Sequence, residues 1–409
     1  MIKSNKLKIF NDPIYGFIRI PNTLIFDLIA DPFFQRLRRI SQMGLSYLVY
    51  PGAHHTRFHH ALGCMHLMQR AIQVLKFKEV VITKEEEEGL LIAILLHDIG
   101  HGPFSHAMEH SIVEGVNHEH ISLCFMEELN ARFNGRLTLA LEIFNGNYTK
   151  KYLNQLVSSQ LDMDRLDYLK RDSFYTGVAE GNTNAERLIT MLNVVDGELV
   201  LEEKGIYSVE KFIMARRFMY WQVYLHKTGV AAEQLLMRIL KRSRELILKG
   251  VALDASKNLL YFLENKIDSS NFNLEILIKF SSLDDIDILS AIKNWQNSPD
   301  FVLSQLCQMV IHRRLLHVKI KNTPFSDSKF NKHFENFKQK NNLTDEETKY
   351  FVFTGEIQNK AYDREYQPIK ILKKNGKVMQ VSKLSDYLKI KAISKTVTKY
   401  YICYPKDYV

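Results

Sequence analysis

An unbroken apolar run from Leu90 to Leu96 constrains the fold of this chain more than any other feature. It is far shorter than the ~20 residues that span a bilayer, so it must be buried inside a folded protein. Thr83 and four glutamates precede it, as at the start of a helix, where an oxygen cap and anions are favoured. A Gly-Pro turn follows it. We therefore predict a buried helix that ends close to His97 and Asp98.

The bulk composition indicates a soluble globular protein. The 409 residues are 46% hydrophobic and 25% charged, enough for about two or three domains. We find neither a membrane-spanning segment nor a signal peptide, and expect a cytoplasmic protein without membrane contact. The net charge of +9 fits polyanionic partners or a basic solvated surface equally well. The cysteines form no CxxC pair and are expected to be reduced; they are Cys64, Cys124, Cys307 and Cys403.

Helical periodicity dominates most of the chain. The opening "KIFNDPIYGFIRIP" is typical of a short hairpin, and the pattern becomes helical from Thr23. Apolar residues then recur every three or four positions, as on one face of a helix. The predicted helical segments include 33–43, 56–75, 119–133, 153–171, 184–192 and 209–248.

The C-terminal part has a different pattern. "YFVFTGEI", "PIKILKKNGKVMQV" and "TKYYICYP" are typical of strands, the second around an Asn-Gly turn. We therefore predict a mainly α fold with three parts: a helical catalytic core with a short N-terminal hairpin over 1–250, a helical extension over 251–345, and a small C-terminal α+β lobe over 346–409.

Two further segments place polar side chains where packing alone does not need them. "HHTRFHHALG" holds four histidines in seven residues, and His60 directly precedes a packed stripe, so its ring can point inward. In "LVSSQLDMDRLDYLKRDS", a continuous helix would place Asp164 on the apolar stripe and pair Arg171 with Asp167. A buried carboxylate needs a cation or a good hydrogen-bonding partner. The residues of that stripe are Val157, Leu161, Asp164, Tyr168 and Asp172.

His60, His97, Asp98 and Asp164 together make a nitrogen and oxygen ligand set for one divalent ion. Such a set suits Zn, Fe, Mn or Ni and does not select among them. A second divalent ion, Mg, is expected only in company with the substrate.

Spare imidazoles and cations surround this set. Imidazoles can protonate a leaving oxygen near neutral pH. Arg57 and Arg165 can hold phosphate oxygens. Phosphoryl-group hydrolysis is the chemistry that this combination favours. The candidate proton-transfer residues are His101, His106, His118 and, next to the last, Glu119.

The order H…HD…D on consecutive helices resembles the signature of the HD-domain metal-dependent phosphohydrolases. The strings "FQRLRRISQMG", "YPGAHHTRFHHALG", "LLHDIGHGPFSH", "NHEH" and "DMDRLDYLKRDS" look like the deoxynucleoside triphosphate triphosphohydrolase (dGTPase-like) branch. The match covers roughly residues 10–245. It implies an HD-domain helical bundle that cleaves a dNTP, dGTP included, to deoxynucleoside and inorganic triphosphate. It also implies a homo-oligomer, such as a dimer or tetramer.

The resemblance also implies roles for individual residues. The ligands would be the four named above, and His101, His106 and His118 would surround the α-phosphate, with His106 or His118 as the general acid. Arg57, Arg165 and Arg216 would hold phosphates. The expected sugar contacts are Gln42, Tyr168, Asp172 and Tyr224, the last excluding a 2′-hydroxyl.

Two positions depart from the family pattern. Glu109 stands where an aspartate supports the catalytic histidine in the eukaryotic enzyme, and Leu225 replaces a base-contacting glutamine. The base preference and any activation by nucleotides therefore stay open.

Three alternatives remain beside this interpretation. One is an HD phosphohydrolase that acts on GTP, GDP or another nucleotide. Another is a regulatory HD protein that binds nucleic acid, and weak nucleic-acid binding beside hydrolysis also fits the basic charge. The last is that the histidines only pack. A cyclic dinucleotide is disfavoured because the chain lacks a Gly-Tyr-Pro motif.

Overall fold

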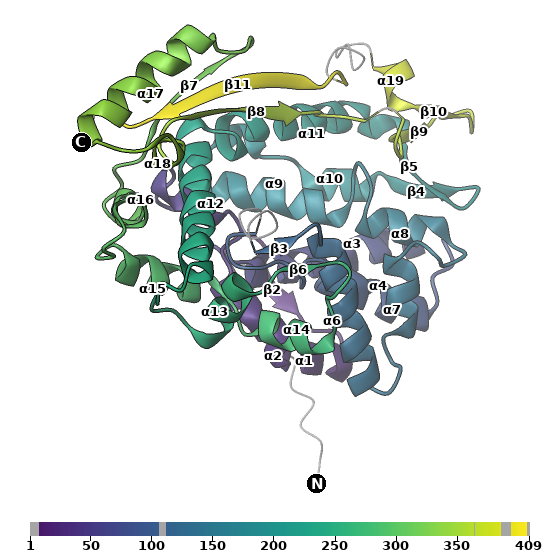
Figure 1. Cartoon of the computed structure of the whole chain (residues 1–409). Helices are drawn as coiled ribbons and strands as arrows, with labels where there is room; N and C mark the ends of the chain where they lie inside the picture. The colour runs from purple at the N-terminus through teal and green to yellow at the C-terminus, as the bar shows by residue number, and fades with distance from the viewer. Residues whose placement is uncertain (1–7, 106–111, 364, 386–393, 407–409) are drawn as a thin grey trace.

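The computed structural model describes residues 8–105, 112–363, 365–385 and 394–406. The predicted hairpin is confirmed: strands β1 (Ile9–Asp12) and β2 (Gly16–Arg19) pair in antiparallel register. The Asp12 carboxylate accepts hydrogen bonds from the backbone N–H groups of Ile14 and Tyr15 and so shapes the turn between the two strands. Figure 1 shows this hairpin packed low in the helical body.

The predicted helix over 33–43 is wrong in its detail. After α1 (Thr23–Ala30), a short α2 (Pro32–Gln35) runs into a 3₁₀ turn over Arg36–Arg39, and Ile40 is already extended. The apolar residues Phe34, Leu37 and Ile40 recur every three positions and are fully buried, which matches the three residues per turn of a 3₁₀ helix. A second 3₁₀ turn covers Gly44–Leu48.

Helices α3 (Arg57–Phe77) and α4 (Lys84–Leu96) form the centre of the body and pack against each other. Thr83 caps α4 in a reciprocal capping box with Glu86, as the sequence predicted. Every residue from Gly89 to Leu96 is buried. The apolar run is therefore a rigid core helix whose C-terminal end carries His97.

The predicted helix over 153–171 is two helices. These are α8 (Lys151–Val157) and α9 (Met163–Thr176). The break arises because the Asp162 carboxylate accepts the N–H groups of Ser159 and Arg165, which ends one segment and caps the next. Val157 and Leu161 therefore do not lie on α9 with Asp164.

Further elements surround this centre. The segment predicted over 119–133 is α6 (His118–Arg132), followed by α7 (Thr138–Phe144). The segment 184–192 contains α10 (Ala185–Thr190), and a 3₁₀ turn (Ala179–Gly181) precedes it. A hairpin of β4 (Leu192–Val195) and β5 (Glu198–Glu202) and a 3₁₀ turn (Glu203–Gly205) follow.

The helical segment 209–248 is interrupted beside the cavity described below. Helix α11 (Ile206–Met219) continues into a π-helical turn over Tyr220–Tyr224 before α12 (Lys227–Leu248) begins. A π turn adds a residue to the helix and so rotates the side chains that follow it.

The extension is helical but contains two strands that the periodicity did not indicate. Strand β6 (Ile267–Asp268) pairs in parallel with β3 (Val113–Glu114), and β7 (His317–Lys321) joins the C-terminal sheet. Its helices are α13 (Lys257–Glu264), α14 (Leu274–Ser281), α15 (Asp285–Trp295), α16 (Phe301–Ile311) and α17 (Asp327–Asn341).

The predicted C-terminal strands are present and lie along one side of the body (Figure 1). After α18 (Asp345–Thr348), strand β8 (Phe353–Asn359) pairs with β11 (Val397–Tyr404) in the order β7-β11-β8. Strands β9 (Lys370–Leu372) and β10 (Val378–Gln380), which precede α19 (Val381–Leu384), join the β4–β5 hairpin instead, because β9 pairs in parallel with β5. Strands from the predicted parts share sheets, so the division into three parts stays a prediction.

The architecture is mainly α, as predicted. Among the described residues, no helix is long and apolar enough to cross a membrane.

The cap of α4 gives a first prediction. Replacing Thr83 with Ala removes the side-chain acceptor for the Glu86 N–H and should lower the free energy of unfolding by about 0.5–2 kcal/mol. Thermal unfolding followed by circular dichroism measures this. Thr190→Ala, at an exposed hydroxyl that donates to a carbonyl of its own helix, is the control and should change stability less. An equal effect of the two variants would contradict the cap.

Candidate active site

One cavity of about 890 Å³ brings the predicted site together. Of the predicted site residues, His60 lies buried behind its wall and His106 lies outside the described residues. All the others line it: Gln42, Arg57, His97, Asp98, His101, His118, Glu119, Asp164, Arg165, Tyr168, Asp172, Arg216 and Tyr224.

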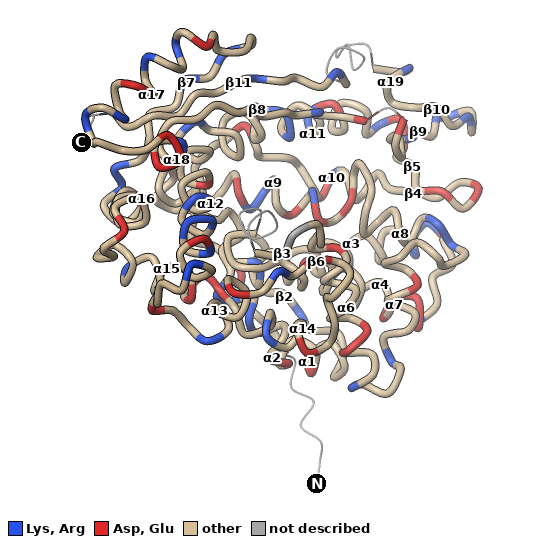
Figure 2. Tube along the Cα trace, viewed as in Figure 1, with Lys and Arg blue, Asp and Glu red and all other residues tan. Residues whose placement is uncertain are grey.

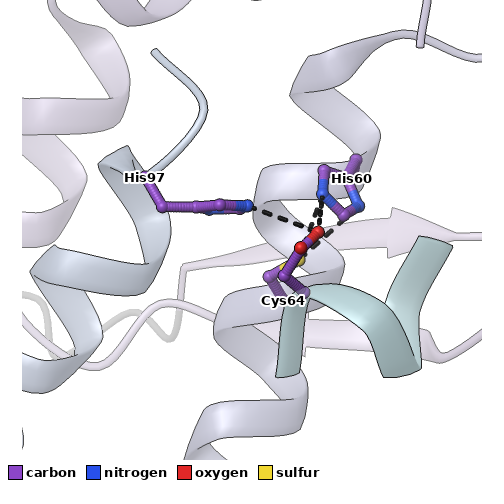
Figure 3. Close-up of side chains that lie close together, drawn as sticks. His60, Cys64 and His97 are labelled. Atoms are coloured by element: carbon purple, nitrogen blue, oxygen red, sulfur yellow. Dashed lines mark hydrogen bonds and ion pairs between the residues drawn. The ribbon is translucent and has the colours of Figure 1, made fainter. Parts of the chain in front are cut away.

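The four predicted metal ligands converge at its floor. Nε2 of His60 lies 3.1 Å from Oδ1 of Asp164 and 3.7 Å from Oδ2 of Asp98. Nε2 of His97 lies 3.4 Å from Oδ1 of Asp98 and 3.6 Å from Oδ1 of Asp164. Donor atoms about 2.0–2.2 Å from one shared ion stand roughly 3.0–3.6 Å apart. Figure 3 shows His60 and His97 approaching from two helices.

The rings of His60 and His97 are oriented by contacts of their Nδ1 atoms. Nδ1 of His60 lies 2.8 Å from Oδ2 of Asp167, and Nδ1 of His97 lies 2.7 Å from the carbonyl oxygen of Ile94. Since both contacts need a hydrogen on Nδ1, the neutral form of each ring presents the lone pair of Nε2 to the cluster. Nε2 of His97 is buried and makes no hydrogen bond with any described residue. These residues therefore fit a divalent metal ion.

The cluster also includes Cys64, a residue that the sequence did not indicate. Its sulfur lies 3.5 Å from Nδ1 and 3.6 Å from Nε2 of His60, so it stands beside the ring and not along the lone pair of Nε2. Burial raises the pKa of the Cys64 thiol, which keeps it protonated in the described structure. We therefore assign it to packing.

Asp167 joins the metal cluster to the hairpin. It accepts two hydrogen bonds from Arg171, 2.8 and 3.0 Å long, as the sequence predicted for this pair. The remaining Arg171 Nη1 donates to Asp12 at 2.8 Å. Burial alone raises the pKa of Asp167, but Arg171 and His60 lower it to about 2. Gly63 gives this pair room, because a Cβ there would stand 2.0 Å from Oδ1 of Asp167.

His101 and His118, which the resemblance predicts to surround a phosphate, both line the cavity. Their rings stack with centroids 3.9 Å apart. Burial and the Arg57 cation hold the pKa of His101 well below its usual value, so this ring is neutral at pH 7. His118 opens α6, and Glu119 beside it is exposed in the first turn, where the helix dipole favours an anion.

Arg57 connects the metal ligands to the turn after α4. Its Nη1 pairs with Asp98, and its Nη2 donates to the Ser105 hydroxyl at 2.7 Å. Burial alone raises the pKa of Asp98, but His97 and Arg57 hold it well below its usual value. Asp98 is therefore an anion.

Arg165 and Arg216 also line the cavity, and their guanidinium groups are positively charged hydrogen-bond donors. Arg165 pairs with the buried Asp162, and Arg216 Nη1 lies 3.4 Å from Oε1 of Gln160. The Nε atoms of both arginines are buried and lack a hydrogen-bond acceptor among the described residues. Such donors suit an anionic ligand.

The predicted sugar contacts lie together around Asp172. Tyr224 donates its hydroxyl to Oδ2 of Asp172 at 2.7 Å, and Nε2 of His55 lies 2.7 Å from Oδ1. Tyr168 meets Tyr224 edge to face, with centroids 6.1 Å apart. Gln42 lines the same cavity and its buried Oε1 has no hydrogen-bond partner among the described residues.

The sequence did not assign functions to His55, Ser105 and Gln160. His55 lies in the histidine-rich segment, but directly before α3, where helical periodicity gives no direction for its ring. Ser105 and Gln160 lie within segments quoted above, but in loops, where helical spacing gives no direction for a side chain. Leu225, the departure noted above, lines a separate cavity, and Glu109 lies outside the described residues.

The contact between Nδ1 of His60 and Asp167 gives a prediction. Asp167→Asn removes the anion that orients the His60 ring and should weaken metal affinity by about 10–100-fold. Zn²⁺ competition with a chromophoric chelator measures this. Glu186→Gln, in an exposed ion pair with Arg70 on α3, is the control and should leave the affinity unchanged. Unaltered affinity in Asp167→Asn would contradict the assignment.

Comparisons with known proteins agree with this geometry. The HD domain model matches residues 57–172 and the HD associated region model matches 183–257. An uncharacterised protein, YwfO of Bacillus subtilis, is 33% identical, with 100% of this chain and 94% of that protein covered. The crystal structure of a phosphohydrolase from Bacteroides thetaiotaomicron is 50% identical, with a TM-score of 0.95 over 98% of this chain and 100% of that one.

A more distant relative has a named activity. The deoxynucleoside triphosphate triphosphohydrolase SAMHD1 homolog of Dictyostelium discoideum is 32% identical, with 55% of this chain and 47% of that protein covered. The site contains the His and Asp residues that give the HD domain its name. His60 lies on α3, His97 and Asp98 directly follow α4, and Asp164 lies on α9, so the expectation of consecutive helices is wrong. The chain therefore belongs to the HD-domain phosphohydrolase family and is a hydrolase.

Proposed function

We propose that this protein hydrolyses deoxynucleoside triphosphates to deoxynucleoside and inorganic triphosphate. The observation that carries the proposal is that one cavity is lined by three groups: the His and Asp cluster, the arginines, and the tyrosines around Asp172. A nucleoside triphosphate has three matching parts, because its reacting α-phosphate stands between a charged tail and a sugar. Relatives named as dNTP triphosphohydrolases support the same substrate class.

His60, His97, Asp98 and Asp164 would hold one divalent transition metal. When bound, such an ion stabilises the negative charge of the phosphoryl group as a Lewis acid. Zn, Fe, Mn and Ni all suit this ligand set, and Mg can accompany the substrate.

The side chains around the α-phosphate position the reacting groups. The oxygen of water attacks the α-phosphorus and gives up a proton to the solvent, the bond from phosphorus to the 5′ oxygen breaks, and that oxygen takes a proton. His118, which lines the cavity, would donate this proton, and the resemblance gives His106 the same candidate role. The neutral His101 beside it can accept a hydrogen bond. Arg57, Arg165 and Arg216 would neutralise the triphosphate.

The sugar side favours deoxyribose. Each carboxylate oxygen of Asp172 already accepts one hydrogen bond and keeps a second lone pair for a 3′-hydroxyl. The hydroxyl of Tyr224 is fixed by Asp172 and its ring by Tyr168, so the ring cannot move away from a 2′-hydroxyl without breaking both contacts. This arrangement argues against the alternative of a ribonucleotide substrate such as GTP.

The direct test is to incubate the metal-loaded protein with each dNTP and NTP and to identify the products by chromatography. We expect deoxynucleoside and intact triphosphate from dNTPs, and little turnover of NTPs. Orthophosphate or pyrophosphate as the product, or no turnover, would contradict the proposal. Asp164→Ala should lose metal and activity together, whereas Asp327→Ala, at an exposed position on α17, should keep both.

We also propose weak nucleic-acid binding by the C-terminal part. Residues 311–409 hold 21 Lys and Arg against 10 Asp and Glu, whereas the rest of the chain holds 34 against 36. Figure 2 shows basic residues along α17 and near β9 and β10. Phosphate backbones bind such surfaces through charge.

Gel shifts of duplex DNA at rising salt test this second proposal. Affinity should fall steeply with salt, and Lys329→Glu with Lys332→Glu should weaken binding without changing hydrolysis. Lys257→Glu, exposed on α13, is the control. The absence of any shift at low salt contradicts it.

A further inference from the structure

A buried carboxylate from the extension reaches the back of the catalytic cavity. Asp285 is the first residue of α15 and is only 6% exposed. Its Oδ2 accepts the backbone N–H of Ser41 at 2.8 Å, and its Oδ1 accepts that of Phe104 at 3.0 Å. Each oxygen therefore holds one segment of the predicted catalytic core over 1–250.

The Phe104 bond supports a turn with unusual backbone angles. Phe104 has φ of 49° and Ser105 has φ of 39°, the left-handed region, which is unfavourable for residues other than glycine. Such a conformation persists only when surrounding contacts hold it. The Ser105 hydroxyl in this turn accepts the hydrogen bonds of Arg57, at 2.7 and 3.2 Å. The orientation of the Arg57 guanidinium thus depends on the turn that Asp285 holds.

The Ser41 bond supports a neighbouring segment, which leads into α3. Ser41 pairs with Thr56 in an isolated bridge, and the N–H of Gln42 donates to the carbonyl of His55. The N–H of Arg57 donates to the carbonyl of Ile40. Residues 40–42 therefore set the place where α3 begins, one turn before His60.

The two residues before Asp285 contact arginines of the segment that precedes Ser41: Leu283 contacts Arg36, and Asp284 contacts Arg39. Arg36, fully buried, donates to the carbonyl oxygens of Ile99 at 2.8 Å and His101 at 2.9 Å, and to that of Leu283 at 3.4 Å. Asp284 pairs with Arg39. Residues 283–285 thus contact both segments that frame the phosphate side of the cavity.

We propose that Asp285 is a positioning residue for phosphoryl hydrolysis, which acts through the Phe104–Ser105 turn on Arg57 and through Ser41 on the start of α3. The residues of the HD match are then insufficient for an ordered site, because α15 supplies the acceptor for both segments. The effect on turnover rests on the proposed function, whereas the effect on the two amides does not.

The experiment compares Asp285→Ala and Asp285→Asn with wild type and with Asp300→Asn. Asp300 is the matched control: it is also an aspartate at the start of an extension helix, paired with Arg242 and with the Leu303 N–H, and it does not line the cavity. Hydrogen–deuterium exchange of peptides that contain Ser41 or Phe104 reports on the clamp directly. Turnover of whichever nucleotide the wild type hydrolyses, metal content and melting temperature are measured in parallel.

We expect faster exchange at Ser41 and Phe104 in Asp285→Ala, and a fall in kcat of about 10–100-fold with metal content retained. Asp285→Asn keeps one acceptor oxygen and should give a smaller change. Asp300→Asn should lower the melting temperature and leave both exchange and kcat unchanged. Unaltered exchange in Asp285→Ala, or an equal loss of kcat in Asp300→Asn, overturns the proposal. If the wild type hydrolyses no dNTP, the proposed function fails, and the exchange measurement still decides the role of Asp285.

Discussion

The site depends on one carboxylate, that of Asp167, which lies out of reach of solvent between a histidine and an arginine. A buried charge of this kind is stable only while its partners stay in place, and removal of one partner of a buried pair typically costs about 3–5 kcal/mol. His60 gains a fixed tautomer from the contact. Arg171 extends it to Asp12, so that helices α3 and α9 and the N-terminal hairpin share one network of charges.

Charge is also arranged on the far side of the cluster. Asp98 contacts His60 and His97 on one side, and His101 and Arg57 on the other. One anion is therefore shared between the predicted metal ligands and the predicted phosphate contacts. The guanidinium limits the negative potential of the carboxylates, which would otherwise repel a triphosphate. The cavity therefore combines an anionic floor with cationic walls, the arrangement needed to hold a metal ion and a polyanion side by side.

Local patterns predicted the parts of the site that lie on regular helices. The cap at Thr83, the buried run after it and the inward direction of His60 follow from residue type and helical spacing, and family motifs supplied the roles. Other parts depend on contacts between distant segments, which no local pattern encodes. Asp285 meets Phe104 across 181 residues, and the break before Asp164 depends on how Asp162 caps α9. The sequence predicts an α-helix where the structure has the 3₁₀ turn Arg36–Arg39, because apolar residues recur near every third position in both.

The pairing of β5 with β9 has a consequence for biosynthesis. Lys370, which pairs with Glu198, lies 172 residues after it in the chain. During translation the β4–β5 hairpin therefore leaves the ribosome with one edge open and keeps it open while nearly half of the protein is made. An open edge can pair with other chains. The β4–β5 hairpin is thus one place where a nascent or truncated chain is exposed to misassembly, although it does not line the cavity of the site.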